Sequence, residues 1–356
     1  MLCVALWLPA AACQDGQDDE GAKASMEAAG PQSDAAVVED AGCCDGGGEL
    51  SAPAFDADLS HTFDAIEIGP GEENAALCQS WTLGNDTSLW VNAVRSINDG
   101  GWHHSNWIFV PDTMFGDDGT WPCAERGFDQ IIAAASGGVF FAQSTQAEGE
   151  EQRFPEGVAF ELPPGTRIVG QLHLLNFDAA PLRTEFRFEV DTIDAAEVKV
   201  PLRPMAFTNL ALDIAPAVKT VASMQCGLPQ PDLDIYYVLP HYHELGLTLR
   251  LEVVGGSSDG EEIFRADAAF GDPLGKSFDP PIAVRGAQAL RISCEYENPR
   301  DVSVAYGIGD QEMCVVLVYS DAQGLGGGLA LTAAAGQMVG DAYVSEAACL
   351  GGMLLP

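Results

Sequence analysis

Beyond residue 55 the chain consists of short segments in which apolar and polar residues alternate. Alternation with a period of two is typical of a β-strand that buries one face. The clearest example is segment 183–193, where Phe186, Phe188 and Val190 lie on one face and the residues between them are charged. Each such segment is bounded by Gly, Pro, Asn or Asp, which favour turns. The pattern therefore predicts antiparallel strands.

Similar segments recur through the rest of the chain. The strands expected before residue 195 lie in 88–97, 106–111, 137–143, 167–177 and 183–193. Those expected later lie in 205–214, 234–254, 282–297 and 303–320. Within 234–254, one face is expected to carry Leu247, Leu249, Leu251 and Val253, opposite Thr248, Arg250 and Glu252. Segment 129–136 fits a short helix or another strand, and segment 325–337 predicts a loop and a final strand.

This spacing of strands and turns is typical of an all-β fold with two tandem antiparallel β-sandwich domains. A Pro-containing connection near 195–203 is expected to mark the domain boundary. The expected domains are therefore 55–198 and 199–356.

The composition supports this class of fold. The chain has 356 residues, of which 47% are hydrophobic and 19% charged, so it can bury a large core. It contains 39 Gly and 21 Pro, which favours turns and short strands over long helices. Asp and Glu together number 53 against 16 Lys and Arg, giving a formal charge of -37. Because nucleic acid and anionic membranes would be repelled, neither is expected as a partner.

The first residues are typical of an export signal. An apolar run from Leu2 to Leu8 is followed by small residues and Cys13, so 1–13 is expected to be a signal peptide with a lipid-anchor site at Cys13. A lipoprotein and a plainly secreted protein both remain open. The run is too short to span a bilayer, and no transmembrane span is expected. Segment 14–54 is expected to be a disordered acidic tether.

The ten cysteines, in an exported chain, predict disulfides. Cys3 and Cys13 belong to the signal, and the role of the adjacent Cys43 and Cys44 in the tether stays open. Six remain in the expected domains: Cys78, Cys123, Cys226, Cys294, Cys314 and Cys349. Three bridges are expected, and the residues alone do not choose the pairing.

Five of the six histidines are grouped in a way that suggests metal binding. His241 and His243 lie two apart, so a β-strand would present both imidazoles on one face and turn Tyr242 away. His103 and His104 are adjacent and could share an ion only at a strand end or a bulge. The preceding Asp99-Gly100-Gly101 favours such an irregular backbone. A lone His173 completes the group, and His61 is expected at the surface.

An ordered set of motifs carries a more specific signal. In chain order they are LCQSW (77–81), GGWHHSNWIF (100–109), WPCAERG (121–127), GQLHLLNF (170–177), PHYHELGLTLRLEV (240–253) and CEYENPRDVSVAYGIGDQEMCVV (294–316). Over about residues 65–320 the chain resembles the type II copper, ascorbate-dependent monooxygenases, the family of peptidylglycine α-hydroxylating monooxygenase and dopamine β-monooxygenase.

The resemblance implies two jelly-roll-like β-sandwich domains separated by a solvent-filled cleft. It also implies two coppers per chain, one in each domain, facing each other across that cleft. The implied ligands are His103, His104 and His173 for the first copper, and His241, His243 and Met313 for the second. A thioether beside two imidazoles is a soft donor set that favours Cu(I), which agrees with this division. The implied activity is that of an oxidoreductase that uses ascorbate and O₂ to hydroxylate a substrate C–H bond, with the second site catalytic.

The resemblance also implies the disulfides Cys78–Cys123 and Cys294–Cys314, and, as a further family bridge, Cys226–Cys349. The Cys294–Cys314 bridge would hold Met313 in place, because the side chains of Met313 and Cys314 would point to opposite faces of the strand and a bond on one face would fix the ligand on the other.

The chain departs from the peptide-amidating members of the family where they hold a peptide carboxylate. Those positions are Leu239, Val315 and Leu317 here, so a buried carboxylate would lack partners. A small apolar or amine substrate is expected instead. The alternative is a non-catalytic secreted copper-binding or storage protein on the same fold, and a surface interaction module is a third hypothesis.

Overall fold

The computed structural model describes residues 55, 57–267, 271–307, 310–323 and 326–351, and these residues form an all-β fold with very little helix. The expected signal peptide and tether, with Cys13, Cys43 and Cys44, lie outside the described residues. Residues 53–356 form one compact unit. Among the described residues, no helix has the length and apolar character needed to cross a membrane.

The elements before residue 195 form the N-terminal half. They are β1 (Leu59–Thr62), β2 (Ile66–Ile68), β3 (Glu73–Asn74), β4 (Leu77–Thr82), β5 (Leu89–Asn98), β6 (Trp102–Pro111), β7 (Gly119–Pro122), the 3-10 helix η1 (Cys123–Arg126), α1 (Gln130–Ser136), β8 (Gly138–Ala142), β9 (Gly149–Arg153), β10 (Val158–Leu162), β11 (Thr166–Leu175), β12 (Leu182–Thr184) and β13 (Phe186–Ile193).

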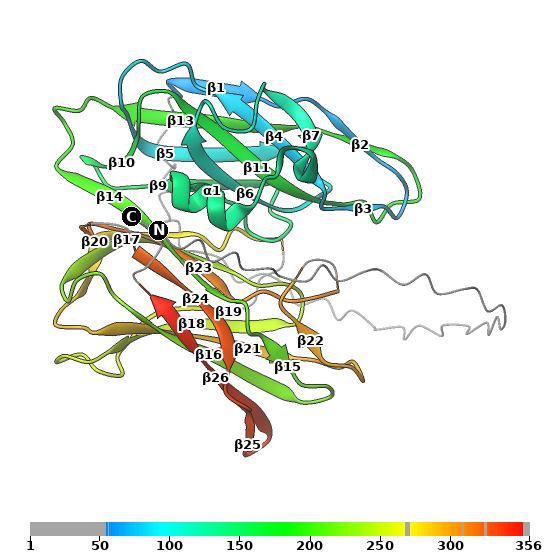
Figure 1. Cartoon of the computed structure of the whole chain (residues 1–356), viewed down its shortest axis with the longest axis vertical. Helices are drawn as coiled ribbons and strands as arrows, with labels where there is room; N and C mark the ends of the chain where they lie inside the picture. Colours follow the sequence, from blue (N-terminus) through cyan, green and yellow to red (C-terminus); the bar gives the residue numbers. More distant parts are fainter. Residues whose placement is uncertain (1–54, 56, 268–270, 308–309, 324–325, 352–356) are drawn as a thin grey trace, which may run out of the picture. The chain divides into compact units, whose positions relative to one another are not determined.

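The remaining strands form the C-terminal half (Figure 1). They are β14 (Val200–Asn209), β15 (Asp213–Ile214), β16 (Lys219–Gly227), β17 (Leu233–His241), β18 (Gly246–Val254), β19 (Glu262–Asp267), β20 (Lys276–Val284), β21 (Ala289–Glu297), β22 (Val304–Ala305), β23 (Val315–Ser320), β24 (Gly326–Ala333), β25 (Gln337–Val339) and β26 (Ala342–Gly351).

The N-terminal half is a sandwich of two sheets. One has the strand order β1-β13-β5-β10, with β9 also paired to β5, and the other has the order β7-β4-β11-β6-β8. Aromatic rings fill the space between them: the ring of Trp107 lies 5.1 Å from that of Phe186 and 4.9 Å from that of Phe188. Phe186, Phe188 and Val190 are fully buried, which confirms the alternation predicted for this segment.

The C-terminal half is a second sandwich. One layer contains β14, β23, β17 and β20, and the other has the order β24-β26-β16-β21-β18-β19; the pairing of β14 with β24 joins the two layers into one continuous sheet. Residues from both sheets form its core, including Met224, Leu251, Ile292 and Val316. The two halves are consecutive in sequence, as expected for tandem jelly-roll-like sandwiches.

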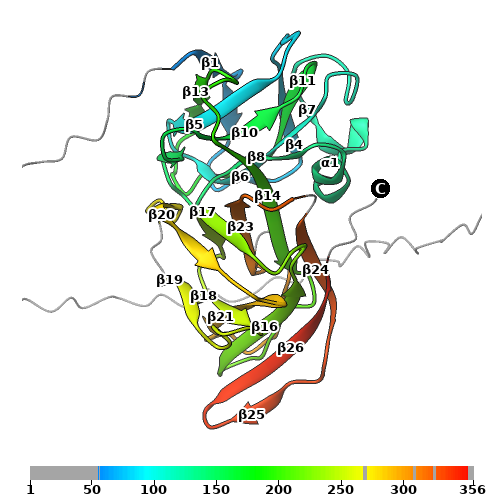
Figure 2. The same cartoon turned by 90° about the vertical axis from the view of Figure 1, so that its left-hand side faces the viewer.

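Strand β14 belongs to both halves. Val200–Leu202 pair in parallel with β10 of the N-terminal half, whereas Arg203–Thr208 pair with β23 and Met205–Asn209 with β24 (Figure 2). Leu202 is buried in the N-terminal core and Met205 in the C-terminal core. The change between the cores therefore occurs within a continuous strand, and the connection expected near 195–203 is part of the sheet.

Strands β17 and β23 are buried on both faces. Val238 and Val318 point into the C-terminal core, while Tyr237, Leu239 and Tyr319 belong to the core of the N-terminal half. The hydroxyl of Tyr319 donates to the backbone carbonyl of Val139 at 2.8 Å, across the junction. The face of β17 that carries Tyr237 and Leu239 therefore continues to His241 facing the N-terminal half.

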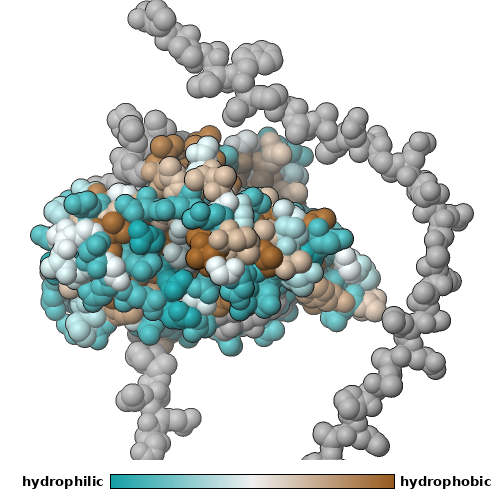
Figure 3. Space-filling view, turned by 90° about the horizontal axis from the view of Figure 1, so that it is seen from below, coloured by the Kyte–Doolittle hydropathy of each residue, from teal (hydrophilic) through white to brown (hydrophobic). Residues whose placement is uncertain are grey.

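The three implied disulfides are present: Cys78–Cys123, Cys226–Cys349 and Cys294–Cys314. Disulfides are typical of oxidising compartments, so they indicate an exported protein. The face seen in Figure 3 is mostly hydrophilic, with smaller hydrophobic patches, as the acidic composition leads one to expect.

Several local expectations are corrected. The ladder slips between Gly246 and Thr248, so Leu247 is only partly buried and lies outside the core that holds Leu249, Leu251 and Val253. For segment 129–136 the structure has the helix of the two alternatives: it runs from Gln130 and is capped by the carboxylate of Asp129, which accepts from the Ile132 N–H. Segment 325–337 does not end the fold, because β25 and β26 follow β24.

Candidate metal centre

The backbone is irregular at His103 and His104, as expected. In the ladder between β6 and β11, His173 pairs with His104 but Leu174 pairs with Trp102, so His103 is the extra residue of a β-bulge. Gly100 and Gly101 precede it with φ values of 87° and 74°, a backbone that favours glycine. The bulge lets both adjacent imidazoles approach His173, whose ring centroid lies 4.6 Å from that of His103 and 4.9 Å from that of His104.

The orientation of His173 is fixed by a carboxylate from β3. Its Nε2 lies 2.6 Å from Oε1 of Glu73. Burial lowers the pKa of His173, with Glu73 opposing the shift, so the imidazole is neutral and Nε2–H donates to the carboxylate. The other nitrogen, Nδ1, is buried without a hydrogen-bond partner among the described residues. Nδ1 is therefore the atom that can bind a metal.

His241 and His243 do not lie on one strand, which corrects the expectation. Strand β17 ends at His241, and His243 lies in the turn that leads to β18. The turn is tight, because a Cβ added at Gly246 would lie 2.4 Å from Cδ2 of Tyr242. The two imidazole centroids are 5.3 Å apart. Their proximity thus comes from the turn and its hydrogen bonds, and not from strand alternation.

The tripeptide Gln311–Met313 supports this turn. The carbonyl oxygen of Gln311 accepts from Nδ1 of His243 at 2.9 Å, which leaves Nε2 as the nitrogen with a free lone pair. The carboxylate of Glu312 accepts from the backbone N–H of His243 at 2.8 Å and of Leu245 at 2.7 Å. Burial raises the pKa of Glu312 to about 7, and these hydrogen bonds oppose the shift.

Met313 is held directly before β23. Its carbonyl oxygen accepts from the hydroxyl of Tyr296 at 2.6 Å, and its neighbour Cys314 is bonded to Cys294 in the C-terminal core. The Met313 side chain lines the cavity between the halves together with His241. The residue is 6% exposed. The disulfide and the tyrosine therefore fix the backbone on one side while the thioether faces the cavity on the other.

The two sets of histidines meet, which corrects the expected solvent-filled gap between them. The centroid of His104 lies 4.6 Å from that of His241 and 5.2 Å from that of His243, and His103 lies 5.5 Å from His243. The nitrogen atoms of His104, His241 and His243 lie within 4.8 Å of one another. The reason is that β17 and β23 turn their outer face toward the N-terminal half.

All five imidazoles are buried and held neutral. Burial lowers the pKa of His103 to about 3 and that of His104 and His241 well below the usual value, and neighbouring imidazoles add to each shift. Burial also lowers the pKa of His243. Neutral imidazole is the form that binds metals. The cluster is therefore arranged to accept a cation and disfavours protons.

Several of these ring nitrogens make no hydrogen bond within the described part of the chain. Both ring nitrogens of His104, and Nε2 of His241 and of His243, are buried without a hydrogen-bond partner there. Each such atom costs about 1–3 kcal/mol of desolvation. A bound metal ion would satisfy one nitrogen of each ring, so the residues fit a metal of the kind that takes imidazole and thioether ligands.

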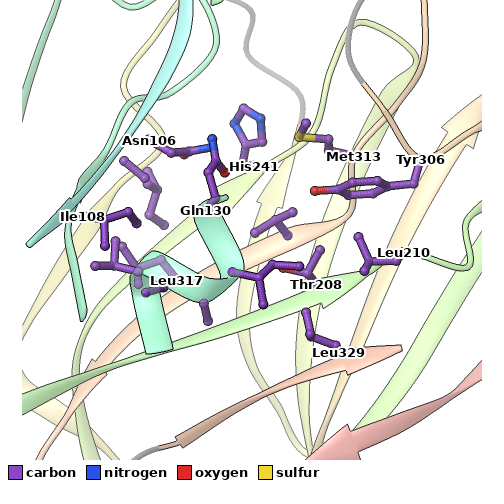
Figure 4. A pocket seen from close by; sticks show the side chains of 17 residues that line it. Asn106, Ile108, Gln130, Thr208, Leu210, His241, Tyr306, Met313, Leu317 and Leu329 are labelled. Carbon is purple, nitrogen blue, oxygen red and sulfur yellow. The ribbon is translucent and has the colours of Figure 1, made fainter. Parts of the chain in front are cut away.

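An apolar cavity adjoins the cluster (Figure 4). It has a volume of about 130 Å³ and lies between α1 with β6 on one side and β14, β17 and β23 on the other. His241, Met313, Asn106 and Tyr306 lie at one end, and aliphatic side chains line the remainder. The aliphatic and aromatic lining residues include Ile108, Ile131, Leu210, Leu239, Tyr306, Val315, Leu317 and Leu329.

The three positions at which the chain departs from the peptide-amidating enzymes all face this cavity: Leu239, Val315 and Leu317. Its polar side chains are Asn106, Gln130, Thr208 and Tyr306, and no Asp, Glu, Lys or Arg lines it among the described residues. Burial raises the pKa of Tyr306 to about 12, so its hydroxyl stays protonated.

The sequence did not reveal the residues that position the ligands. Glu73 lies far from His173 in the chain, and no pattern marks it. Gln311 and Glu312 stand beside Met313, and that adjacency was the one available signal. His61, expected at the surface, is half buried and stacks on Trp81 with centroids 4.8 Å apart, away from the cluster.

Comparisons with known proteins identify the fold only weakly. No family model and no curated protein matches the chain. Among solved structures, the major capsid protein P2 of bacteriophage PM2 is 9% identical, with a TM-score of 0.31 over 74% of this chain and 97% of its own. An empty particle of cowpea mosaic virus is 9% identical, with a TM-score of 0.33 over 76% and 93% of the two chains. These scores are too low to support an argument about function.

Proposed function

We propose that the protein is a copper-dependent monooxygenase that uses an ascorbate-type reductant and O₂ to hydroxylate a C–H bond of a small apolar or amine substrate. The observation that carries the proposal is the position of His241 and Met313 at one end of an apolar cavity. We further propose that the protein is secreted or is held at the cell envelope by a lipid on Cys13.

The donor set favours copper over other metals. Three imidazoles in one group and a thioether beside two imidazoles in the other suit an ion that cycles between Cu(II) and Cu(I), and zinc rarely takes a thioether. The free nitrogen of His173 is Nδ1, and that of His243 is Nε2, because Glu73 and the Gln311 carbonyl engage the opposite atoms. When bound, copper would supply one-electron redox chemistry and the activation of O₂.

The other residues would bind and orient the substrate. Leu239, Leu317 and Ile108 offer an apolar wall that excludes water from the reacting C–H bond. Asn106 and Gln130 hydrogen-bond to each other at 3.3 Å and can accept or donate to a polar group on the substrate. A carboxylate substrate would find no cation here, whereas an amine would be attracted by the acidic chain.

The overall reaction balances with one two-electron reductant. One oxygen atom enters the substrate C–H bond to give an alcohol, and the other leaves as water. Two electrons and two protons are consumed, and an ascorbate-type reductant supplies the electrons in single steps while it is oxidised.

The test is ascorbate-dependent O₂ consumption by copper-loaded protein with a panel of small aromatic and aliphatic substrates. We expect consumption coupled to a hydroxylated product, and we expect Met313→Ile to abolish the coupling. Met338→Ile is the matched control, because Met338 is exposed on β25. Two coppers per chain without any coupled product from the wild type would refute the oxygenase proposal.

A second candidate is a copper-binding or storage protein. The burial of all five imidazoles and their close packing favour it, because such a site holds an ion away from solvent. Under this alternative the protein would bind copper with high affinity, and ascorbate oxidation would yield no hydroxylated product.

A further inference from the structure

We propose that His104, His241 and His243 together hold one metal ion, and that this ion joins the two halves of the protein. The inference rests on the proposed function for the identity of the physiological metal, but not for any redox step. The family resemblance implies a different assignment, in which His104 binds the first ion and His241 and His243 bind the second.

The geometry selects this mixed group. One ligand nitrogen from each of these three residues can be chosen so that all lie within 4.8 Å of one another. A single ion bound at about 2 Å from each imidazole nitrogen needs nitrogens no more than about 4 Å apart, so small side-chain rotations suffice. No other group of three or more His, Cys, Asp or Glu in the described part of the chain meets this condition.

The three side chains also have free nitrogens. Each residue is at most 5% exposed, and none of the free nitrogens named above has a hydrogen-bond partner in the described residues. His243 offers Nε2, because its Nδ1 donates to the carbonyl of Gln311. His173 also keeps one nitrogen on a partner, Glu73 at 2.6 Å, and has only Nδ1 left, whereas both nitrogens of His104 are without a partner there. The most fully unsatisfied side chain of the first group is therefore His104.

The ion would act as a bridge between the halves. His104 lies on β6 of the N-terminal half, whereas His241 ends β17 of the C-terminal half and His243 lies in the turn after it. The halves already share the apolar contacts of β17 and β23, and polar contacts also cross the junction near the cluster: the hydroxyl of Thr145 donates to the carbonyl of Tyr242 at 3.0 Å, and the Gly275 N–H donates to Glu150 at 3.2 Å. An ion bound by residues of both halves would therefore stabilise the closed junction further.

The experiment uses the double variant His103→Ala/His173→Ala, which removes the other two ligands of the first implied site. Zn²⁺ is the probe, because it binds imidazole without redox chemistry. If the sites are separate, His104 has no remaining co-ligands in this background, and its loss leaves Zn²⁺ affinity unchanged. If the ion is shared, adding His104→Ala weakens Zn²⁺ binding by more than the 10–100-fold typical of supporting residues. Adding His61→Ala, outside the cluster, is the matched control.

A second readout measures the junction itself. With Zn²⁺ at about 100 times its dissociation constant, opening of the junction is suppressed about 100-fold. Hydrogen exchange in the peptides around 144–150 and 271–275 should therefore slow in the double variant and not in the triple variant. His104→Gln replaces His104→Ala if the latter does not fold.

The outcomes separate this inference from the proposed function. Equal Zn²⁺ affinities of the double and triple variants, or exchange at the junction that Zn²⁺ does not change, would overturn the shared site. Loss of coupled hydroxylation in the copper-loaded wild type would overturn only the oxygenase proposal, because neither Zn²⁺ readout depends on oxygen or a reductant.

Discussion

Replacing Glu312 with Gln tests how the second pair of imidazoles is positioned. The carboxylate accepts three backbone hydrogen bonds: Oε1 from Leu245 at 2.7 Å, and Oε2 from His243 at 2.8 Å and from Met313 at 3.3 Å. The amide nitrogen of Gln cannot accept, so its best orientation keeps the two bonds at the Oε2 position and loses the bond from Leu245.

The size of the effect follows from that lost bond. A hydrogen bond to a charged group contributes about 1.5–3 kcal/mol, and each 1.4 kcal/mol is a factor of ten. Without this bond the turn that holds His243 is less ordered, and metal binding must order it again. Glu312→Gln should therefore weaken metal affinity by about 10–100-fold, the range usual for supporting residues.

The assay is competition for Cu(I) with a chelator at pH 8, above the pKa of about 7 that burial gives Glu312. The matched control is Glu244→Gln, which removes the same charge beside His243. Glu244 is exposed and pairs with Arg300 at 2.6 Å, so it does not support the turn. Equal weakening by both variants would show that charge alone is responsible, and an unchanged affinity in Glu312→Gln would refute the positioning argument.

Three further predictions concern stability. Burial raises the pKa of Glu150, so the folded protein binds this proton more tightly than the unfolded chain does. The free energy of unfolding should therefore fall as the pH rises from the usual glutamate pKa through the raised one. Denaturation curves measured across this pH range should show that Glu150→Gln removes the slope. Replacing Cys294 and Cys314, 20 residues apart, with Ala should lower the free energy of unfolding by about 3 kcal/mol in denaturant titrations, and an unchanged midpoint would contradict it. Gly170→Ala should lower the free energy of unfolding by about 1–3 kcal/mol, because its Cβ would lie 2.3 Å from Cε3 of Trp107. Thermal unfolding measures this, and an unchanged melting temperature would show that β11 accommodates the methyl group.

The strand pattern predicted much of the fold because burial of one face leaves a period of two in the sequence. That is why β13 was predicted with the correct faces. The same reasoning failed at Leu247, which a slip in the ladder at the start of β18 leaves outside the core. A bulge of this kind leaves no mark in the order of apolar and polar residues, whereas the bulge at His103 was signalled by two glycines.

The proposed ligands were named from the sequence, but their arrangement was not. The meeting of His104 with His241 depends on which face of β17 turns toward the N-terminal half, and both faces of that strand are apolar. Likewise, Glu73 and Glu312 act through single contacts with distant residues, and such contacts have no period or spacing. Local patterns therefore identified the donors, and tertiary packing decided their neighbours.

The shared strand β14 limits how the halves can move. Because its hydrogen bonds run without a gap from β10 to β23 and β24, the halves cannot separate as two bodies on a loose tether. Any widening between the histidines must instead twist or bend the backbone near Arg203 and Pro204, where the pairing passes from one sandwich to the other. Opening of the metal centre is thereby coupled to the deformation of one shared strand.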